Sequence, residues 1–325
     1  MDFIAEKITF DLAEPFNITG HEFTDTETVR VTLRDGDAVG RGETVGTYYL
    51  NETADSMLAE LEGIDPDLID ALDKISVSDV MPLCGARNAL DCAFWDLKAK
   101  KTGRSIWDLL NLVPKPLTTV YTISMDTAEA MAAKSAGASR YPHLKLKLNN
   151  EHPIEKLEAI RAARPDAELI IDVNQGWNFD ELREYLPHCA RLGVRMIEQP
   201  LPRGADEALE GFRSSVPLGA DESCLGIDEF DACRARYDVL NIKLDKCGGL
   251  SEGLALVEAA QNSGMQLMVG NMMGSSLSMA PSYVIGQFCE FVDIDGPLLL
   301  AQDIEGGLIF SEGGRVGYPS PALWG

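Results

Sequence analysis

Five short apolar runs decide the fold of this chain: HLKLKLN (143–149), ELIIDVNQ (168–175), VRMIEQP (194–200), VPLGADES (216–223) and DVLNIKLD (238–245). Each run has an ionisable residue at or near its end, and these residues are 22 to 26 positions apart: Lys147, Asp172, Glu198, Asp221 and Lys243. A (β/α)8 barrel shares ~250 residues over eight strand–helix units, so one unit has a similar length. The spacing therefore predicts that all five side chains arrive at one rim, the C-terminal face of a barrel.

Three further runs bring the number of predicted strands to eight: TTVYTISM (118–125), MQLMVGN (265–271) and EFVDIDG (290–296). Helical stretches such as PIEKLEAIRAARP (153–165) lie between the runs, and this alternation predicts a parallel sheet. The expected fold is α/β, with a (β/α)7–8 TIM-type barrel. The alternative is an open doubly wound sheet, but no G-x-G-x-x-G follows a strand, so a dinucleotide site has no support.

The first 115 residues have a different rhythm. VRVTLRDGDAVGRGET (29–44) predicts a β-hairpin around Asp35-Gly36-Asp37, and ARNALDCAFWDLKAKKTG (86–103) predicts a helix that ends at Gly103. We expect residues 1–115 to form an α+β capping domain that acts as a substrate-specificity lid. We expect residues 116–325 to form the barrel, with a C-terminal tail that can return to the cap.

The chain of 325 residues is strongly acidic, with 52 Asp and Glu against 28 Lys and Arg and a formal net charge of −24. Such a surface repels nucleic-acid phosphates and anionic headgroups, and no apolar run approaches the ~20 residues of a membrane span. We therefore expect neither a nucleic-acid nor a membrane partner. The seven cysteines contain no C-x-x-C pair, and the N-terminus lacks the features of a secretion signal. These features predict a cytoplasmic protein with reduced thiols.

Three of the strand-end residues are acids that would converge at the barrel mouth: Asp172, Glu198 and Asp221. Carboxylates brought together in a partly dry site repel one another, so a cation is expected among them. Oxygen ligands favour Mg²⁺, with Mn²⁺ as the other candidate. Asn174 lies on the same side of the strand as Asp172, and we expect it to add an amide oxygen or to support the ligands from behind. The alternative is that the acids point outward into solvent.

The run HLKLKLN places its leucines on one side of a strand and Lys145 and Lys147 on the other. In a barrel the lysines face the interior; the alternative is an edge strand with two solvated lysines. Close ammonium groups disfavour each other's charge, so Lys145 is expected to lower the pKa of Lys147, which then acts as a general base. Lys243 is expected to face Lys147 across the mouth. Two bases on opposite sides of one carbon suit removal of a proton on one side and its return on the other.

Taken together, these residues resemble the enolase superfamily, and within it the muconate-lactonising subgroup. The resemblance covers essentially the whole chain, through the capping module, the helix at 86–103, the K-x-K of 145–147, D-V-N-Q-G-W (172–177), I-E-Q-P (197–200), A-D-E-S (220–223) and N-I-K-L-D-K-C-G-G (241–249). It implies one Mg²⁺ held by the three acids, with Lys147 and Lys243 as the catalytic acid/base pair. It also implies that Lys145 and the metal stabilise the enolate formed when the α-proton leaves a carboxylate substrate.

The last barrel run, FVDIDGP (291–297), discriminates among the reactions of this subgroup. Asp293 and Asp295 alternate by two and both face the interior, where two unpaired acids need a cation such as a substrate ammonium. This D-x-D resembles the ammonium clamp of the dipeptide epimerases; the alternative is one acid capping a helix and the other in solvent. The expected activity is an Mg²⁺-dependent dipeptide epimerase, with 1,1-proton transfer at the α-carbon of the C-terminal residue. The other reactions considered are those of muconate cycloisomerase, o-succinylbenzoate synthase and N-acylamino acid racemase.

Two positions differ from the L-Ala-D/L-Glu epimerases that the chain resembles. His21 stands where our alignment expects an Arg that pairs with the glutamate side chain, and Met273-Gly274 stands where a Glu is expected after V-G-N-M. A neutral His is a weaker partner for an anion than Arg. We therefore expect an apolar or otherwise different second residue rather than glutamate.

The loop at 42–53 carries Tyr48 and Tyr49, and we weigh a lid that closes over the substrate against ordinary packing of the β module. Thr122, His21 and Tyr48 complete the expected substrate contacts. The expected partner is a small dipeptide, and the resemblance leaves a homo-oligomer open.

Overall fold

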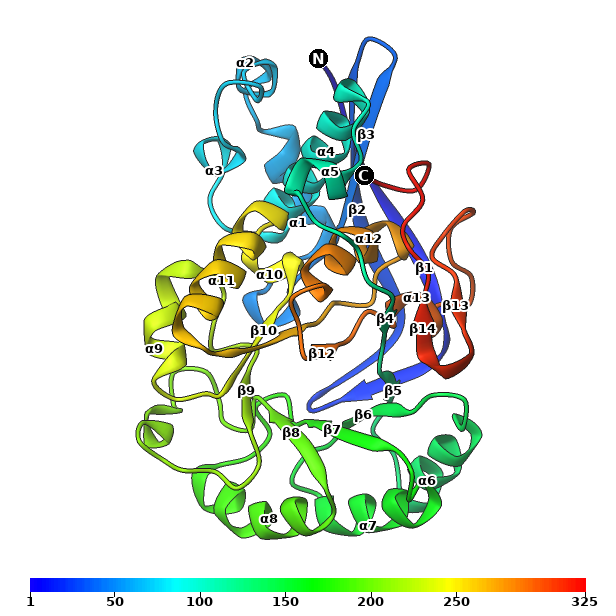
Figure 1. Cartoon of the computed structure of the whole chain (residues 1–325), viewed down its shortest axis with the longest axis vertical. Helices are drawn as coiled ribbons and strands as arrows, with labels where there is room; N and C mark the ends of the chain where they lie inside the picture. Colours follow the sequence, from blue (N-terminus) through cyan, green and yellow to red (C-terminus); the bar gives the residue numbers. More distant parts are fainter.

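The computed structural model describes residues 1–325, which form two parts (Figure 1). The first part contains an antiparallel sheet in the order β1-β2-β3: β1 Asp2–Ile18, β2 His21–Asp35 and β3 Ala38–Val45. The hairpin predicted around Asp35-Gly36-Asp37 is confirmed. Gly36 has a φ of +61°, which a glycine adopts without strain.

Five helices follow this sheet along the chain: α1 Ala54–Glu62, α2 Pro66–Asp70, α3 Val77–Val80, α4 Gly85–Thr102 and α5 Ile106–Leu110. Helix α4 is the predicted long helix, and it ends at Gly103 in the left-handed conformation, with a φ of +63°. A side chain at Gly40 or Gly42 of β3 would clash with the carbonyl oxygens of Ala93 and Ala89 of α4. These glycines therefore let α4 pack closely on the sheet.

The second part is a sheet of eight parallel strands that neighbour one another in chain order: β5 Tyr121–Ile123, β6 His143–Lys147, β7 Glu168–Asp172, β8 Val194–Glu198, β9 Leu218–Ala220, β10 Val239–Ile242, β11 Gln266–Val269 and β12 Phe291–Val292. Each strand corresponds to one of the eight apolar runs. The backbone N–H of Val120 donates to the carbonyl oxygen of Val292 at 2.9 Å, which joins the two edges of the curled sheet. The predicted (β/α)7–8 barrel is therefore confirmed, and the open doubly wound sheet is wrong.

Helices cover the outside of the barrel: α6 Ala128–Gly137, α7 Pro153–Ala163, α8 Phe179–Arg191, α9 Phe230–Arg234, α11 Leu250–Ser263 and α12 Ser276–Gly286. Two short helices, α10 Leu244–Cys247 and α13 Gly296–Leu299, follow strand ends at the rim and contact the cap. In Figure 1, α6, α7 and α8 lie along the lower side of the sheet. A small separate sheet has the order β13-β14-β4: β13 Phe310–Ser311, β14 Arg315–Val316 and β4 Leu117–Thr118. Single 3-10 turns occur at η1 Tyr48–Leu50, η2 Glu207–Leu209, η3 Ile227–Glu229 and η4 Glu312–Gly314.

Two apolar layers hold the barrel together. A cluster of 54 buried residues lies between the strands and the helices, and it includes Leu144, Leu146 and Leu148 of the K-x-K run. A second cluster fills the inside of the ring toward the N-terminal ends of the strands: Val120, Ile170, Met196, Val239, Met268 and Phe291. Because this inner layer closes the floor, the interior is available to polar side chains only at the C-terminal rim.

The cap contacts the barrel mouth through the hairpin of β1 and β2, which reaches down from the cap in Figure 1. The tip of this hairpin is anchored on two barrel loops. Thr19 Oγ1 donates to the carbonyl oxygen of Val173 at 2.9 Å, and the backbone N–H of Asn17 donates to Ser124 Oγ at 2.7 Å. Residues of the hairpin are thereby held beside the rim where the strand-end side chains gather.

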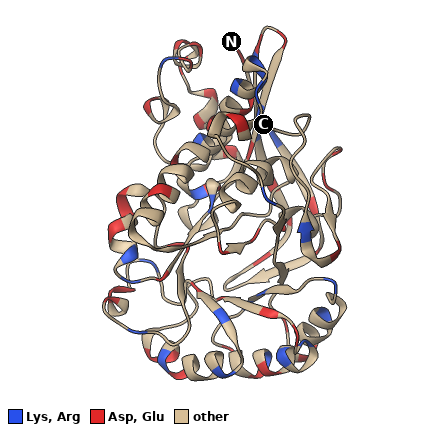
Figure 2. Ribbon diagram, viewed as in Figure 1, with Lys and Arg blue, Asp and Glu red and all other residues tan.

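The C-terminal tail lies on the cap. Trp324 Nε1 donates to the carbonyl oxygen of Cys92 at 3.0 Å, and the backbone N–H of Gly325 donates to Asp96 Oδ1 at 2.7 Å. Acidic residues are spread over the helices and loops of both parts, with basic residues interspersed among them (Figure 2). No helix combines the length and the apolar character that crossing a membrane requires.

Candidate active site

The predicted site residues meet at the C-terminal rim of the barrel. Lys147, Asp172 and Glu198 are direct neighbours across β6, β7 and β8, because the register pairs Lys147 with Asp172 and Asp172 with Glu198. Asp221 and Lys243 each follow the last residue of their strand, β9 and β10. All three acids are fully buried. The strand geometry therefore places these five side chains at one level, as the spacing predicted.

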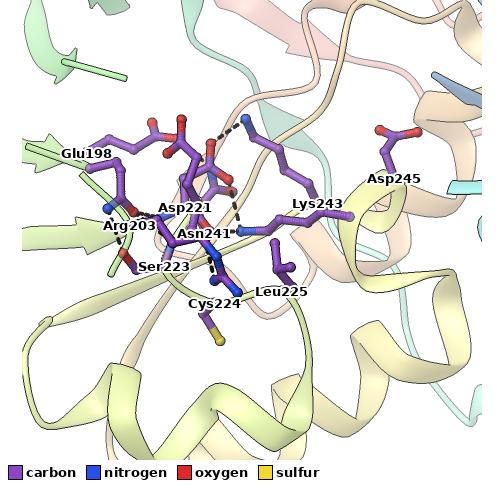
Figure 3. Close-up of polar contacts among 12 residues, drawn as sticks. Glu198, Arg203, Asp221, Ser223, Cys224, Leu225, Asn241, Lys243 and Asp245 are labelled. Carbon is purple, nitrogen blue, oxygen red and sulfur yellow. Dashed lines mark hydrogen bonds and ion pairs between the residues drawn. The ribbon is translucent and has the colours of Figure 1, made fainter. Parts of the chain in front are cut away.

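Each of the three acids has one carboxylate oxygen held by a donor of the protein. The backbone N–H of Asn174 donates to Asp172 Oδ1 at 3.0 Å, Asn241 Nδ2 donates to Glu198 Oε1 at 2.6 Å, and Lys246 Nζ donates to Asp221 Oδ1 at 2.9 Å. Figure 3 shows Glu198, Asp221 and Asn241 grouped beside Lys243. The second oxygen of each acid is left for a cation, and in this structure that cation is a lysine ammonium.

Lys145 occupies the centre of this arrangement. Its Nζ lies 2.8 Å from Glu198 Oε2, 2.8 Å from Asp293 Oδ2 and 3.2 Å from Asp172 Oδ2. Burial alone lowers the pKa of a lysine, but here the three carboxylates outweigh it and raise the pKa of Lys145 well above its usual range. Lys145 is therefore held as a cation among the acids.

The two predicted bases each touch a different acid. Lys147 Nζ lies 2.6 Å from Asp172 Oδ2, and Lys243 Nζ lies 2.6 Å from Asp221 Oδ2. Burial lowers the pKa of Lys243, but its carboxylate neighbours, Asp221 above all, raise it above the usual value. In the order of the ring, β6 and β10 are four strands apart out of eight, so Lys147 and Lys243 face each other across the mouth.

The three predicted metal ligands lie among lysine side chains. As the side chains stand, no group of three or more His, Cys, Asp or Glu side chains is arranged as a metal site, because lysine ammonium groups lie among the acids. The donor set nevertheless suits a hard divalent cation. Its atoms are all carboxylate oxygens, and two buried ones, Glu198 Oε2 and Asp221 Oδ2, are contacted by a lysine ammonium and by no other donor of the protein. The chemistry of these residues therefore fits Mg²⁺. Binding of Mg²⁺ would displace the lysine ammonium groups from these oxygens.

Asn174 supports the site in a more specific way than was expected. Besides holding Asp172 through its backbone, it accepts a hydrogen bond at Oδ1 from Lys147 Nζ, at 3.2 Å. It therefore orients both a predicted ligand and a predicted base.

The acid pair on the last strand differs in one respect from the expectation. Asp293 is not unpaired, because Lys145 reaches it from β6, two strands away around the closed ring. Asp295 Oδ2 accepts the backbone N–H of Thr122 at 2.6 Å, and its side chain does not cap the following helix. Burial, reinforced by the charge of Asp293, raises the pKa of Asp295 well above its usual range. The pair is thus one acid compensated by Lys145 beside one that has no lysine partner.

A cavity of about 290 Å³ opens above these groups, and it gathers most of the predicted substrate contacts. Its lining includes Lys145, Lys147, Lys243, Asn174, Thr122, Asp293, Asp295 and Tyr48. His21 is not part of the lining: it is exposed and packs edge-on against Tyr48, with ring centroids 4.7 Å apart. Phe23, two residues further along the same face of β2, lines the cavity instead.

The loop that carries Tyr48 is fastened to the cap by Glu52. The two carboxylate oxygens of Glu52 accept the backbone N–H groups of Thr47 at 3.1 Å and of Gly85, at the start of α4, at 2.9 Å. Tyr48 thereby lies over the cavity, with the ring of Tyr49 packed against it at 5.2 Å.

Sequence reasoning missed Glu222 and Lys246. Lys246 holds Asp221, and Glu222 is fully buried with no hydrogen-bond partner for either carboxylate oxygen. Both stand inside motifs already singled out, A-D-E-S and N-I-K-L-D-K, one or three residues from a predicted site residue. Their closeness in sequence to predicted site residues could have identified them, because the first turn of chain after a strand end still lies at the rim.

The buried charges of the rim do not balance by count. Seven carboxyl groups (Asp172, Glu198, Asp221, Glu222, Asp245, Asp293, Asp295) are buried with four ammonium groups (Lys145, Lys147, Lys243, Lys246). Burial, with Asp221 and Asp172 close by, raises the pKa of Glu222 to about 8. A divalent cation would add positive charge among these acids.

Two family models match the chain. The one described as "Mandelate racemase / muconate lactonizing enzyme, N-terminal domain" matches residues 4–111, and "Enolase C-terminal domain-like" matches residues 126–319. Among curated relatives, an L-Ala-D/L-Glu epimerase from Escherichia coli (strain K12) is 38% identical, over 93% of this chain and 95% of its own. An N-acetyl-D-glutamate racemase from a Pseudoalteromonas species is 35% identical, over 91% and 94%.

Solved structures extend the similarity to the whole chain. An enolase family member from Agrobacterium tumefaciens with homology to dipeptide epimerases, with bound sodium and L-Ala-L-Glu, has a TM-score of 0.96, 40% identity and 99% coverage of both chains. A dipeptide epimerase from Methylococcus capsulatus, complexed with Mg and L-Arg-D-Lys, has a TM-score of 0.88 and 29% identity, over 99% of this chain and 98% of its own. These matches confirm the resemblance seen in the sequence: the chain belongs to the mandelate racemase/muconate-lactonising enzyme family of the enolase superfamily.

Proposed function

We propose that this chain is an Mg²⁺-dependent dipeptide epimerase, an isomerase that inverts the α-carbon of the C-terminal residue. The observation that carries the proposal is the placement of Lys147 and Lys243 on opposite sides of one cavity, with three carboxylates between them. Inversion by proton transfer needs one group on each face of the reacting carbon. The similarity to relatives named as dipeptide epimerases supports the same activity.

The side chains divide the reaction among them. The Lys147 amine takes the α-proton from one face, and the Lys243 ammonium gives a proton to the opposite face; in the reverse direction the two exchange roles. The Lys145 ammonium stabilises the negative charge that develops on the substrate carboxylate when the proton leaves. Asp172, Glu198 and Asp221 would hold Mg²⁺, which supplies positive charge that polarises that carboxylate. The same positive charge would offset the carboxylates that stabilise the charged form of the lysines.

Asp293 and Asp295 distinguish a dipeptide from the other substrates of the family. A free α-ammonium gains from the Asp295 carboxyl, which has no lysine partner, and from Asp293, which it would share with Lys145, whereas muconate and succinylbenzoate bring no amine to them. An N-acylamino acid racemase is the second candidate, because a named N-acetyl-D-glutamate racemase is 35% identical. Its substrates also lack the ammonium group, so the acid pair favours the dipeptide. A homo-oligomeric state stays a prediction.

The proposal is tested by proton exchange with solvent. The protein is incubated with Mg²⁺ and a library of L,L-dipeptides in D₂O, and mass spectrometry and chiral chromatography follow α-deuterium and the L,D product. We expect both in at least one dipeptide, and neither after chelation of the metal. A library without exchange, combined with exchange in N-acetylamino acids or a changed carbon skeleton in an amine-free acid, would favour the alternatives.

A further inference from the structure

The side of the cavity that faces the cap is an apolar wall made of Phe16, Ile18, Phe23, Tyr48, Met273 and Leu299. All six belong to one apolar cluster, with Leu12 and Leu300 behind them. Phe23, Tyr48, Met273 and Leu299 remain half-buried, so part of each is turned toward open space. This apolar wall therefore offers surface that a ligand can cover.

The cavity has no positive charge to spare for an acidic side chain. Its only cationic lining residues are Lys145, Lys147 and Lys243, and each already lies within 3.2 Å of a carboxylate oxygen. Nearer the cap the lining contributes further acids, Asp25 and Glu27. A carboxylate side chain placed there would lose hydration, meet like charge and gain no partner.

A cationic side chain is not favoured either. Glu27 already has a counter-ion, because Lys7 Nζ lies 3.2 Å from its Oε1, and Asp25 is exposed to solvent. An exposed carboxylate contributes little to binding a charge, whereas the apolar wall contributes in proportion to the area covered.

The proposed reaction fixes the direction of the reacting residue's side chain. Proton removal and return on opposite faces require Lys147 on one side of the α-carbon and Lys243 on the other, which leaves three directions in the plane between them. The carboxylate takes the direction of Lys145 and the strand-end acids, and the amide nitrogen takes that of Asp293 and Asp295. The floor of the barrel is filled. The third direction therefore leads toward the cap and its apolar wall.

We infer that the residue at which this enzyme inverts configuration carries an apolar side chain, as in L-Ala-L-Leu or L-Ala-L-Phe. The inference rests on the proposed function and gives its substrate class. It sets this chain apart from the 38% identical relative named for L-Ala-D/L-Glu. The apolar wall, with Phe23 on its hairpin, is the specificity-determining surface.

A matched panel tests the inference, with L-Ala-L-Leu, L-Ala-L-Phe, L-Ala-L-Glu and L-Ala-L-Lys differing only in the second residue. We expect kcat/KM for α-deuterium exchange to be about tenfold or more higher for the apolar members. A higher value for L-Ala-L-Glu or L-Ala-L-Lys overturns the inference and leaves the epimerase proposal standing. No exchange in the panel or in a wider dipeptide library removes the proposed function, and this inference with it.

Phe23→Arg tests the apolar wall directly. It places a guanidinium in the lining, and we expect the ratio of kcat/KM for L-Ala-L-Glu over L-Ala-L-Leu to rise about tenfold or more, whereas Phe23→Leu keeps the apolar preference. Thr24→Arg is the matched control, because it makes the same charge change at the next residue, on the opposite face of β2. An equal change of ratio in both Arg variants, or none in Phe23→Arg, overturns the assignment. Met273→Lys repeats the test from another segment if thermal unfolding shows that Phe23→Arg does not fold.

Discussion

Lys147 and Asp172 lie directly opposite each other in neighbouring strands, and Lys147 Nζ is 2.6 Å from Asp172 Oδ2. A residue proposed to move a proton thus contacts one proposed to hold the cation. Across the ring, Lys243 stands in the same relation to Asp221, also at 2.6 Å. Because the two bases lie on opposite sides of the cavity, single substitutions can separate the two faces of the reaction.

Replacing either base should abolish inversion but leave exchange on one face. With Lys147→Ala we expect epimerisation to fall by about 10²–10⁴-fold or more, while the epimer whose α-hydrogen faces Lys243 still exchanges it with D₂O. With Lys243→Ala we expect only the other epimer, whose α-hydrogen faces Lys147, to exchange it with D₂O. Proton NMR of each pure epimer in D₂O measures this, and Lys98→Ala, on the exposed side of α4, is the control. Exchange of the same epimer by both variants would contradict the two-face arrangement.

Binding of Mg²⁺ should stabilise the folded protein through the three acids. A ligand that binds only the folded state adds about 2.7 kcal/mol to the free energy of unfolding at a concentration of 100 times Kd. We expect Mg²⁺ to raise the unfolding temperature of the unmodified protein and to lose most of this effect in Asp221→Asn and Glu198→Gln. Asp231→Asn is the control, since the Asp231 side chain is 88% exposed. The measurement requires no turnover, and equal stabilisation in all variants would refute the assignment of the ligands.

The acid pair on the last strand should matter only to substrates that carry an ammonium group. Asn in place of Asp295 keeps an oxygen that can accept the Thr122 N–H but removes the carboxyl. Hydrogen bonds to charged groups contribute roughly 1.5–3 kcal/mol, so we expect kcat/KM for dipeptides to fall about 10–100-fold in Asp295→Asn. N-acetylamino acids, if turned over at all, should keep their rate. A parallel loss on both substrate types would assign Asp295 a purely structural part.

Glu222 should make the stability of the metal-free protein depend on pH. Burial, with Asp221 and Asp172 close by, raises the pKa of Glu222 from 4.5 to about 8. Between these values the folded state keeps a proton that the unfolded state has lost. The contribution of Glu222 is therefore complete below pH 4.5 and is lost as the pH rises through 8, on the order of 1 kcal/mol per pH unit.

Urea unfolding from pH 5 to pH 9 in the presence of EDTA measures this contribution. The free energy of unfolding should fall with pH more steeply in the unmodified protein than in Glu222→Gln, which carries no titratable group at this position. Parallel pH dependences in the two proteins would show that Glu222 titrates with its ordinary pKa.

Local periodicity was enough to predict the barrel and the level of its polar residues. Alternation along a strand decides which side chains face inward, and the length of one strand–helix unit returns the chain to the same rim. For this reason the sequence alone assigns Lys145, Lys147, Asp172, Glu198 and Lys243 to the mouth.

Contacts between distant segments were beyond such reasoning. Asp293 was expected to be unpaired, yet Lys145, 148 positions earlier in the chain, reaches it because closure of the ring brings the first strands beside the last one. His21 and Phe23 share one face of β2, so alternation cannot tell them apart. The depth at which the hairpin tip is anchored on the barrel decides that Phe23 lines the cavity and His21 does not.

The amino-acid sequence by itself thus determined the eight-stranded barrel, the acids and lysines at its rim and the family, because these follow from spacing within single units and from motifs. The tertiary structure alone decided which charges neutralise one another and which cap residues line the cavity. The physical reason is that charge compensation and cavity shape depend on distances between segments that only the packing of cap on barrel sets.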